Sequence, residues 1–340
     1  MLNHVAMRNY GPLRDVKWAN LQGINLIIGE NGSGKSFLLK SLYSSMRTIE
    51  EYKRGDDKRT EMEILAEKLY WTFQTEKIGD LVSKSASEPL FCEISLENRD
   101  FSYSFGKDTS KQIQTLRNQT SPRSNNSIFL PSKEVLSLYH IILESREKDR
   151  LFGFDDTYLD LVRALALPRK GGKNYVEFAD SRKALEKILD GKVEYDESSK
   201  RWLFKKGHQK FAIGVTAEGI KKIAILDSLL ANRYLDTNSI IFIDEPESAL
   251  HPAAISDFMD IIAVLAERGI QFFLASHSYF VIKKLCLIAR QKNMSIPLIS
   301  LHNTEDQKVQ YDDLQNGVPN NPIINESIRL YEEEIAGVLG

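Results

Sequence analysis

The stretch that most constrains this chain is Gly29-Glu30-Asn31-Gly32-Ser33-Gly34-Lys35-Ser36, which has the form G-x-x-x-x-G-K-[ST]. An apolar run over 24–28 precedes it and is typical of a buried strand, and apolar residues at helical spacing follow it over 37–43. Three glycines between a strand and a helix let successive backbone N–H groups point at phosphate oxygens, and the helix adds its positive N-terminal end. The stretch therefore predicts a phosphate-binding loop rather than a plain Gly/Ser-rich turn.

This loop predicts ATP and Mg²⁺ as ligands. Lys35 would reach the β- and γ-phosphates and belong to the catalytic residues, and the Ser36 hydroxyl would bind Mg²⁺. The residues expected to bind nucleotide here are Gly29, Asn31, Gly32, Ser33, Gly34, Lys35 and Ser36.

A second apolar run, Ile240-Ile241-Phe242-Ile243, ends in Asp244-Glu245. Ligands bind at the carboxyl ends of parallel strands, so these two acids are expected beside the phosphate loop. Asp244 would hold Mg²⁺, directly or through water, and Glu245 would polarise the attacking water as general base. The alternative is an ordinary acidic strand end.

A third apolar strand ends in Ala275-Ser276-His277-Ser278. A histidine one strand beyond the acids could donate a hydrogen bond to the γ-phosphate and position the water. His277 is therefore a candidate catalytic residue, and the alternative is a polar cap of the strand.

Composition limits the other classes of function. The 340 residues are 42% hydrophobic, and the net charge of −2 gives no global basic field of the kind that marks a dedicated nucleic-acid binder. The two cysteines, Cys92 and Cys286, form no Cys-x-x-Cys, so we expect no zinc site and a reducing, cytoplasmic location. No apolar run of about 18 residues is present, so we expect no contact with a membrane.

Strands and helices alternate in a way that predicts an α/β fold with a mostly parallel sheet and helices on both faces. Strands are expected over 4–8, 16–18, 21–28, 90–96, 101–105, 127–131, 192–197, 201–205, 209–215, 239–246, 270–277 and 296–301. Helices are expected over 35–51, 61–74, 133–150, 156–167, 181–189, 220–234, 252–268, 279–291 and 322–339. The polar stretch 107–126, which carries four basic residues, is expected to be a loop or a weak strand pair.

The order of these motifs, completed by Ser248-Ala249-Leu250-His251, resembles the ABC-type ATPases. The resemblance is to the branch of SMC proteins, RecF-like repair ATPases and OLD-like proteins of bacterial phage defence, and it covers roughly 1–48 and 210–305. It implies a P-loop NTPase fold of ABC type, with Ser248–His251 as the D-loop at a dimer interface and His277 as the switch histidine. It also implies an ATPase domain made of 1–48 and 210–340, with an inserted β-hairpin and helical lid over 49–209.

Two further motifs of that family are degenerate here. The signature, which would complete the ATP site of an opposite subunit, falls on Val215–Lys222, where Thr216 and Gly219 can still supply a hydroxyl, a glycine and helix N–H groups. The Q-loop position falls on Pro131–Glu134, where no glutamine is present and Lys133 or Glu134 could substitute.

Three functions remain open. The first is an ATPase that forms a head-to-tail homodimer or a higher oligomer on ATP and regulates a separate effector, a nuclease or toxin, in bacterial phage defence. The second is a RecF-like DNA-repair ATPase, for which a local basic face would be needed; whether DNA or RNA binds stays open. The third is an ATP-dependent scaffold without significant turnover, against which the intact Lys35, Asp244, Glu245 and His277 argue.

Overall fold

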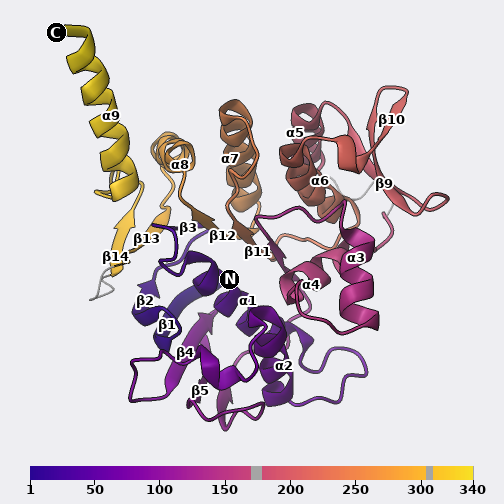
Figure 1. Cartoon of the computed structure of the whole chain (residues 1–340), viewed down its shortest axis with the longest axis vertical. Coiled ribbons are helices and arrows are strands. Elements are labelled where there is room, and N and C mark those ends of the chain that lie inside the picture. The colour runs from indigo at the N-terminus through magenta and orange to yellow at the C-terminus, as the bar shows by residue number, and fades with distance from the viewer. Residues whose placement is uncertain (170–177, 304–308, 340) are drawn as a thin grey trace.

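The computed structural model describes residues 1–169, 178–303 and 309–339. Within them the strands form three sheets (Figure 1). The order in the main sheet is β14-β13-β3-β12-β11-β7. These strands are β3 (Ile24–Gly29), β7 (Ser127–Leu130), β11 (Ile240–Asp244), β12 (Gln271–Ser276), β13 (Pro297–Leu301) and β14 (Val309–Asp313).

The central strands of the main sheet pair in parallel, and only β14 runs antiparallel at its edge. Every residue of β3, β11 and β12 is buried, because helices or a second sheet cover both faces. Alternate side chains enter two separate cores: Ile241 and Ile243 lie in one, and Ile240 and Phe242 lie in the other. The fully apolar runs of the sequence follow from this burial.

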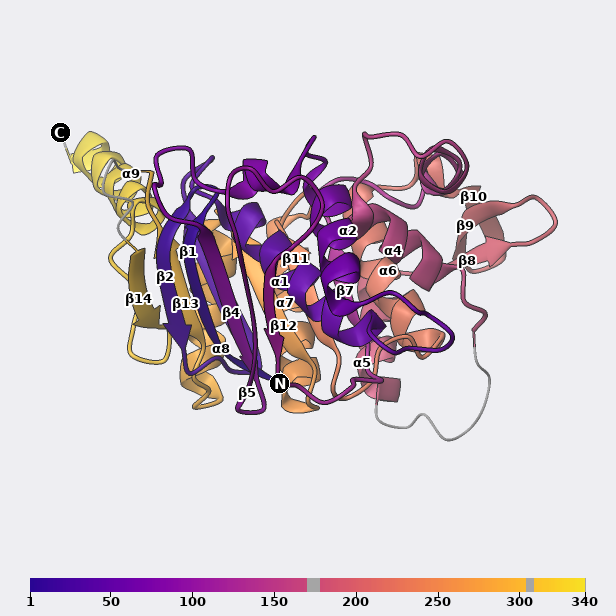
Figure 2. The ribbon, with the colours of Figure 1, turned by 90° about the horizontal axis from the view of Figure 1, so that it is seen from below.

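Helices α6 (Glu218–Ala231), α7 (Pro252–Glu267) and α8 (Tyr279–Gln291) cover one face of the main sheet (Figure 1). Helix α1 (Lys35–Glu51) lies on the other face, between the main sheet and the antiparallel sheet (Figure 2). Helix α2 (Glu61–Phe73) packs against α1. The mostly parallel sheet with helices on both faces is the α/β arrangement that the sequence predicted.

The antiparallel sheet has the order β2-β1-β4-β5-β6. Its strands are β1 (Leu2–Tyr10), β2 (Leu13–Ala19), β4 (Leu90–Leu96), β5 (Arg99–Phe105) and β6 (Thr115–Asn118). The hairpin β4–β5 therefore continues the sheet of the N-terminal strands, and β7 joins the main sheet, although the sequence places both within 49–209. Strand β6 lies in the polar stretch that was expected to be a loop or a weak strand pair.

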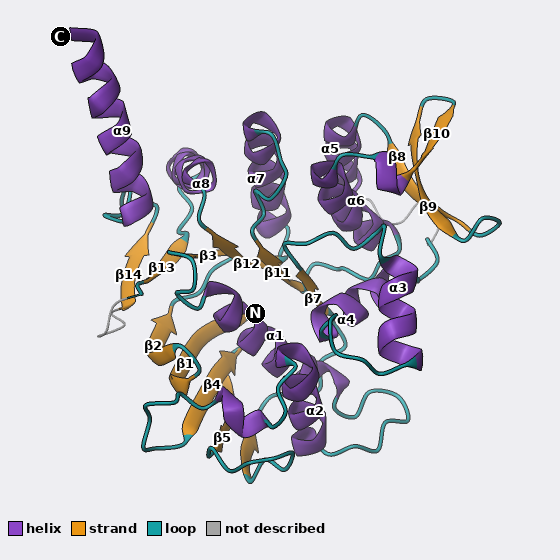
Figure 3. Cartoon of the chain, viewed as in Figure 1, coloured by secondary structure: helices purple, strands orange, loops and turns teal. Residues whose placement is uncertain are grey.

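A third, small sheet has the order β10-β9-β8 and stands beside α5 and α6 (Figure 3). It is built from β8 (Lys192–Asp196), β9 (Arg201–Lys206) and β10 (Gln209–Ala212). The helices of this region are α3 (Tyr139–Leu143), α4 (Asp156–Leu165) and α5 (Ala179–Leu189), and the last helix of the chain is α9 (Pro322–Leu339).

The prediction of one continuous helix over 133–150 is wrong. Helix α3 spans only Tyr139–Leu143 and continues as a π-helical turn over Glu144–Lys148. Both carboxylate oxygens of Glu134 accept a hydrogen bond from the backbone N–H of Ser137, at 3.1 and 3.0 Å. This local side-chain contact stabilises a turn in place of the first helical turns. The strand expected over 209–215 is also shorter, because Ile213–Val215 form a 3-10 turn.

Candidate ATPase site

The loop between β3 and α1 bends at its three glycines. Gly29, Gly32 and Gly34 have φ angles of 153°, 81° and 99°, a region that side chains rarely adopt. A Cβ on Gly29 would lie 2.3 Å from the carbonyl oxygen of Leu301, so the strand β13 also requires glycine there. The Nζ of Lys35 donates to the carbonyl oxygens of Gly29 and Glu30, at 2.8 Å each. The ammonium group is thus held inside the loop. That it reaches the β- and γ-phosphates stays a prediction.

Asp244, at the end of β11, faces the start of α1. Ser36 and Asp244 line the same cavity, and Asp244 Oδ1 is buried without a hydrogen-bond partner. Burial raises the pKa of Asp244, and the nearby Ser36 hydroxyl opposes that rise. A buried carboxylate oxygen without a partner, beside a hydroxyl, suits a hard cation such as Mg²⁺. Ser36 and Asp244 are the residues that would hold it.

Glu245 and His277 meet next to Asp244. The Nδ1 of His277 lies 3.6 Å from Glu245 Oε1, and both side chains are partly exposed, 47% for His277 and 36% for Glu245. Glu245 has a φ of 50°, which turns the chain out of the strand, and its backbone N–H donates to Ala275 O at 2.8 Å. Two side chains 32 residues apart in sequence therefore lie together at one edge of the sheet, open to solvent on one side.

Glu247 is a further residue of the site, which the sequence motifs did not indicate. Its Oε1 accepts hydrogen bonds from Ser276 Oγ at 2.9 Å and from the backbone N–H of His277 at 3.1 Å. It also lies 3.6 Å from the His277 ring nitrogen Nδ1. Glu247 therefore ties the loop after β11 to the end of β12 and fixes the backbone of the histidine. The motif Glu-Pro-Glu was visible in the sequence, but its second acid was assigned no role.

Lys222 was missed as well, although it lies in the predicted signature stretch. Its Nζ donates to Glu245 O at 2.6 Å and to Asp244 O at 3.4 Å, from beneath the two acids. Burial lowers the pKa of Lys222 to about 8, while the carboxylates of Glu247, Asp244 and Glu245 oppose that change. This lysine joins α6 to the end of β11.

Gly219, on the first turn of α6, lies against the predicted D-loop. A Cβ there would be 2.6 Å from Ala249 O and 2.6 Å from the Leu250 side chain. Ala249 itself has a φ of 59°. In the described part of the chain, no hydrogen bond or ion pair joins Thr216 or Gly219 to the phosphate loop of the same chain.

A cavity of about 370 Å³ lies over Ser36 and Asp244 and reaches the predicted Q-loop position, with Lys133 and Glu134 in its wall. Lys40 and Asp155 line it too, and their charged groups are 2.6 Å apart. Glu134 also faces Lys221, at 3.6 Å. The structure thus brings this segment to the site, and the choice between Lys133 and Glu134 stays a prediction.

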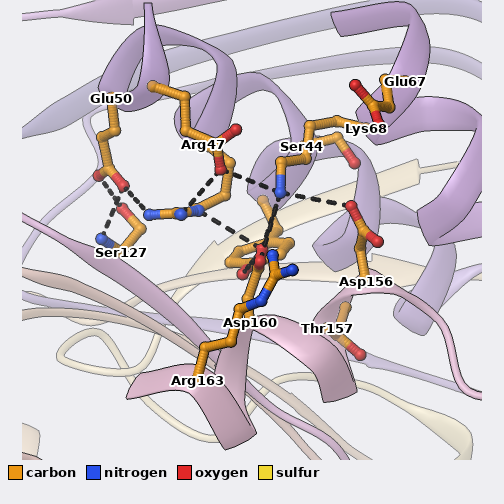
Figure 4. Close-up of polar contacts among 12 residues, drawn as sticks. Ser44, Arg47, Glu50, Glu67, Lys68, Ser127, Asp156, Thr157, Asp160 and Arg163 are labelled. Carbon is orange, nitrogen blue, oxygen red and sulfur yellow. Dashed lines mark hydrogen bonds and ion pairs between the residues drawn. The ribbon is translucent and has the colours of Figure 1, made fainter. Parts of the chain in front are cut away.

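Behind the site, a buried ion-pair network joins α1, α2 and α4 (Figure 4). Asp160 accepts from Tyr43 Oη at 2.7 Å and from Lys68 Nζ at 3.0 Å, and it lies 3.5 Å from Arg47 Nε. Lys68 and Arg47 lower the pKa of Asp160 against the effect of burial. The network holds α4 to the helix that follows the phosphate loop.

Residues 24–283 match the model of the family described as "AAA domain, putative AbiEii toxin, Type IV TA system". The chain belongs to this family. The match contains the phosphate loop, the two acids and His277, so the family is defined over the part of the chain that carries the site.

Solved structures show the same fold. An SMC head bound to the C-winged helix domain of ScpA aligns with a TM-score of 0.57 and 14% identity, covering 93% of this chain and 98% of that one. An SMC head with an extended coiled coil, bound to the C-terminal domain of ScpA from Pyrococcus furiosus, aligns with a TM-score of 0.52 and 12% identity, covering 98% of each chain. At such identities the likeness is one of fold.

One curated relative is the Old nuclease of Escherichia phage P2, which is 45% identical over 42 residues. That match spans 12% of this chain and 7% of the nuclease. Among the described residues, no helix has the length and apolar character needed to cross a bilayer. Nor does the described part of the chain contain a cluster of three or more His, Cys, Asp or Glu side chains suited to a metal ion.

Proposed function

We propose that this family member is an ATPase that hydrolyses ATP to ADP and phosphate with Mg²⁺ as cofactor. The observation that carries the proposal is the convergence of four side chains at one edge of the main sheet: Lys35, Asp244, Glu245 and His277. The Lys35 ammonium is already in the loop, held by two carbonyl oxygens that it can exchange for phosphate oxygens.

The chemistry would be in-line attack of water on the γ-phosphate. Glu245 lies at a solvent-open edge, where its carboxylate can accept a proton from the attacking water, and His277 beside it can hydrogen-bond the γ-phosphate. Mg²⁺ bound by Ser36 and Asp244 would neutralise phosphate charge. Catalysis would come mainly from positioning and from charge stabilisation.

Two chains would enclose two nucleotides head to tail. Thr216 and Gly219 make no hydrogen bond to the phosphate loop of their own chain in the described residues, and Val215 beside them is 79% exposed. These features suit a signature segment that acts on a second copy. ATP binding would then favour the closed dimer, and hydrolysis would release it.

The output we propose is control of a separate effector protein in bacterial phage defence. The family description names a toxin, and the short stretch of likeness to the Old nuclease points to the same class of systems. This step rests on relatives rather than on the site. Phage plating on cells that carry the gene with its neighbours, against cells that carry Glu245→Gln, tests it; equal plating efficiency would exclude a defence role that depends on hydrolysis.

The test of the chemistry is Glu245→Gln. We expect ATP turnover to fall at least about a hundredfold, because the general base is lost, while ATP still binds. Turnover is measured by phosphate release, and binding by a fluorescent ATP analogue. Glu267→Gln, which removes an exposed carboxylate at the far end of α7, is the matched control and should leave turnover unchanged. Unchanged hydrolysis in the Glu245 variant would overturn the proposed mechanism.

A further inference from the structure

Helix α9 projects from the body of the molecule, and only its beginning is packed (Figure 1). Asn321 is buried and its side chain accepts from the backbone N–H of Ile323 at 3.0 Å, and Ile324 is 5% exposed. From Ile328 to Gly337 every residue is exposed. More than half of the helix therefore has no partner in the described part of this chain.

The exposed part carries one apolar stripe. Ile324, Ile328, Tyr331 and Ile335 follow one another at spacings of four, three and four residues, which places them on one side of a helix. Ile328, Tyr331 and Ile335 are 50%, 63% and 40% exposed. An isolated helix of this length is marginal in water, and such a stripe gains free energy by packing against another helix.

Charge decides which kind of helix fits. The segment 322–337 contains four glutamates and one arginine, a net charge of −3. Arg329 is engaged on the side away from the stripe, by Glu326 at 2.6 Å and by Glu333. Glu332 and Glu334 flank the stripe on its two sides and make no ion pair with any described residue. The docking surface is therefore an apolar seam with free carboxylates along both edges.

We propose that this face of α9 docks a basic amphipathic helix of another protein. The partner would place apolar side chains against Ile328, Tyr331 and Ile335, and lysines or arginines against Glu332 and Glu334. A second copy of α9 would instead bring another three net negative charges alongside the first three, which disfavours self-pairing. The proposal concerns a surface distinct from the ATP site and does not depend on turnover.

The experiment uses the full chain and two synthetic helices of about four heptads with leucine at positions a and d. One peptide has lysine at positions e and g, and the other has glutamate there. Titration by fluorescence anisotropy should show binding of the lysine peptide at least about tenfold tighter than binding of the glutamate peptide, with affinity falling as salt rises. Binding of neither peptide, or of both equally, would overturn the proposal.

Variants locate the contact. Ile328→Ser with Ile335→Ser should weaken binding of the lysine peptide at least about tenfold, because the seam is lost. Leu330→Ser is the matched control: Leu330 is 53% exposed on the same helix but lies off the stripe, so its loss should leave affinity unchanged. Glu332→Lys with Glu334→Lys should reverse the preference toward the glutamate peptide.

The alternative occupant gives a different result. If α9 pairs with a second copy, sedimentation of the nucleotide-free chain will show a dimer that Ile328→Ser with Ile335→Ser dissolves, and this outcome would overturn the proposal. A monomer under the same conditions supports it. Circular dichroism of each variant checks that the fold is retained.

Discussion

Lys222 links α6 to the backbone of Asp244, the proposed metal ligand, and of Glu245, the proposed general base. Its hydrogen bonds to the carbonyl oxygens of Glu245 and Asp244 hold the backbone of these residues at the end of β11. Lys222→Met removes both bonds, so we expect kcat to fall at least about tenfold with KM for ATP changed less. Lys222→Arg, which keeps a buried donor, should recover part of kcat. If Lys222→Met lowers kcat and folding stability together, and Lys222→Arg recovers neither, then Lys222 has only a structural role.

The same lysine makes stability depend on pH. Its pKa is about 8 in the folded chain against 10.5 ordinarily, so the unfolded chain binds more protons between these values. Through Lys222, the free energy of unfolding therefore rises with pH between about 8 and 10.5. Below this range Lys222 is charged in both states, and burying its charge destabilises the folded chain by the full amount. Chemical denaturation of wild type and Lys222→Met at several pH values isolates the effect. The difference between them should change across the window; parallel curves would contradict the assignment.

At the residue scale, the sequence indicates candidate site residues where the residues that act together are also neighbours in the chain. The loop from Gly29 to Ser36 and the pair Asp244-Glu245 stand out as site candidates because a strand, a turn and a charge follow one another directly. Glu247 and Lys222 could not, since their roles consist of contacts to Ser276, His277 and backbone carbonyls of other elements. Nothing in the residues around them specifies those partners.

At the scale of elements, the contact between α6 and the loop after β11 depends on the absence of a side chain at Gly219. Gly219→Ala would press a methyl group against Ala249 O and Leu250, so we expect α6 to shift and stability to fall by about 1–3 kcal/mol. Gly214→Ala is the matched control, because its nearest neighbour would be Ser137 Oγ at 3.9 Å. Urea denaturation compares the two. Equal stabilities of the two variants would mean that the loop around Ala249 and Leu250 moves to accommodate the methyl group without loss of stability.

The network of Figure 4 makes a second prediction about elements. Asp160→Asn keeps the shape of the side chain but leaves the buried cations Lys68 and Arg47 short of one negative charge. We expect a loss of about 3–5 kcal/mol in the free energy of unfolding. Glu147→Gln, which breaks the exposed pair with Arg163, should change it by less than about 1 kcal/mol. Similar losses in both variants would contradict the special role of the buried cluster.

Helices with apolar residues at regular spacing could be predicted from the sequence. Segments whose conformation depends on a side-chain contact could not. Helices α1, α8 and α9 have the bounds that the sequence predicted, because their apolar period is regular. The region after β7 has apolar residues at helical spacing too, yet Glu134 accepts from the backbone of Ser137 and a turn forms. Propensity gave no sign of that competition.

For the whole molecule, the sequence predicted the parallel sheet and its helices but not how the antiparallel strands assemble. Strands β1 and β4 pair although 79 residues separate the end of one from the start of the other. Such non-local pairing depends on the shape of the whole chain, and alternating apolar residues specify a strand but not its neighbour. The proposed boundary at residue 48 follows the segment that contains the phosphate loop. The division of the chain into domains at this residue remains a prediction.

The head-to-tail arrangement is the prediction that belongs to the whole molecule. Lys35→Ala should inactivate the phosphate loop, and Val215→Asp should inactivate the exposed signature segment, so each variant alone should be nearly inactive. In a mixed dimer, one site would combine the intact loop of the Val215 variant with the intact signature of the Lys35 variant. An equal mixture should therefore regain about a quarter of wild-type turnover, since about half of the dimers are mixed and each has one complete site. Phosphate release measures this recovery. Mixing that gives only the average of the two inactive proteins would mean that each site is complete within one chain, and the proposed dimer would be wrong.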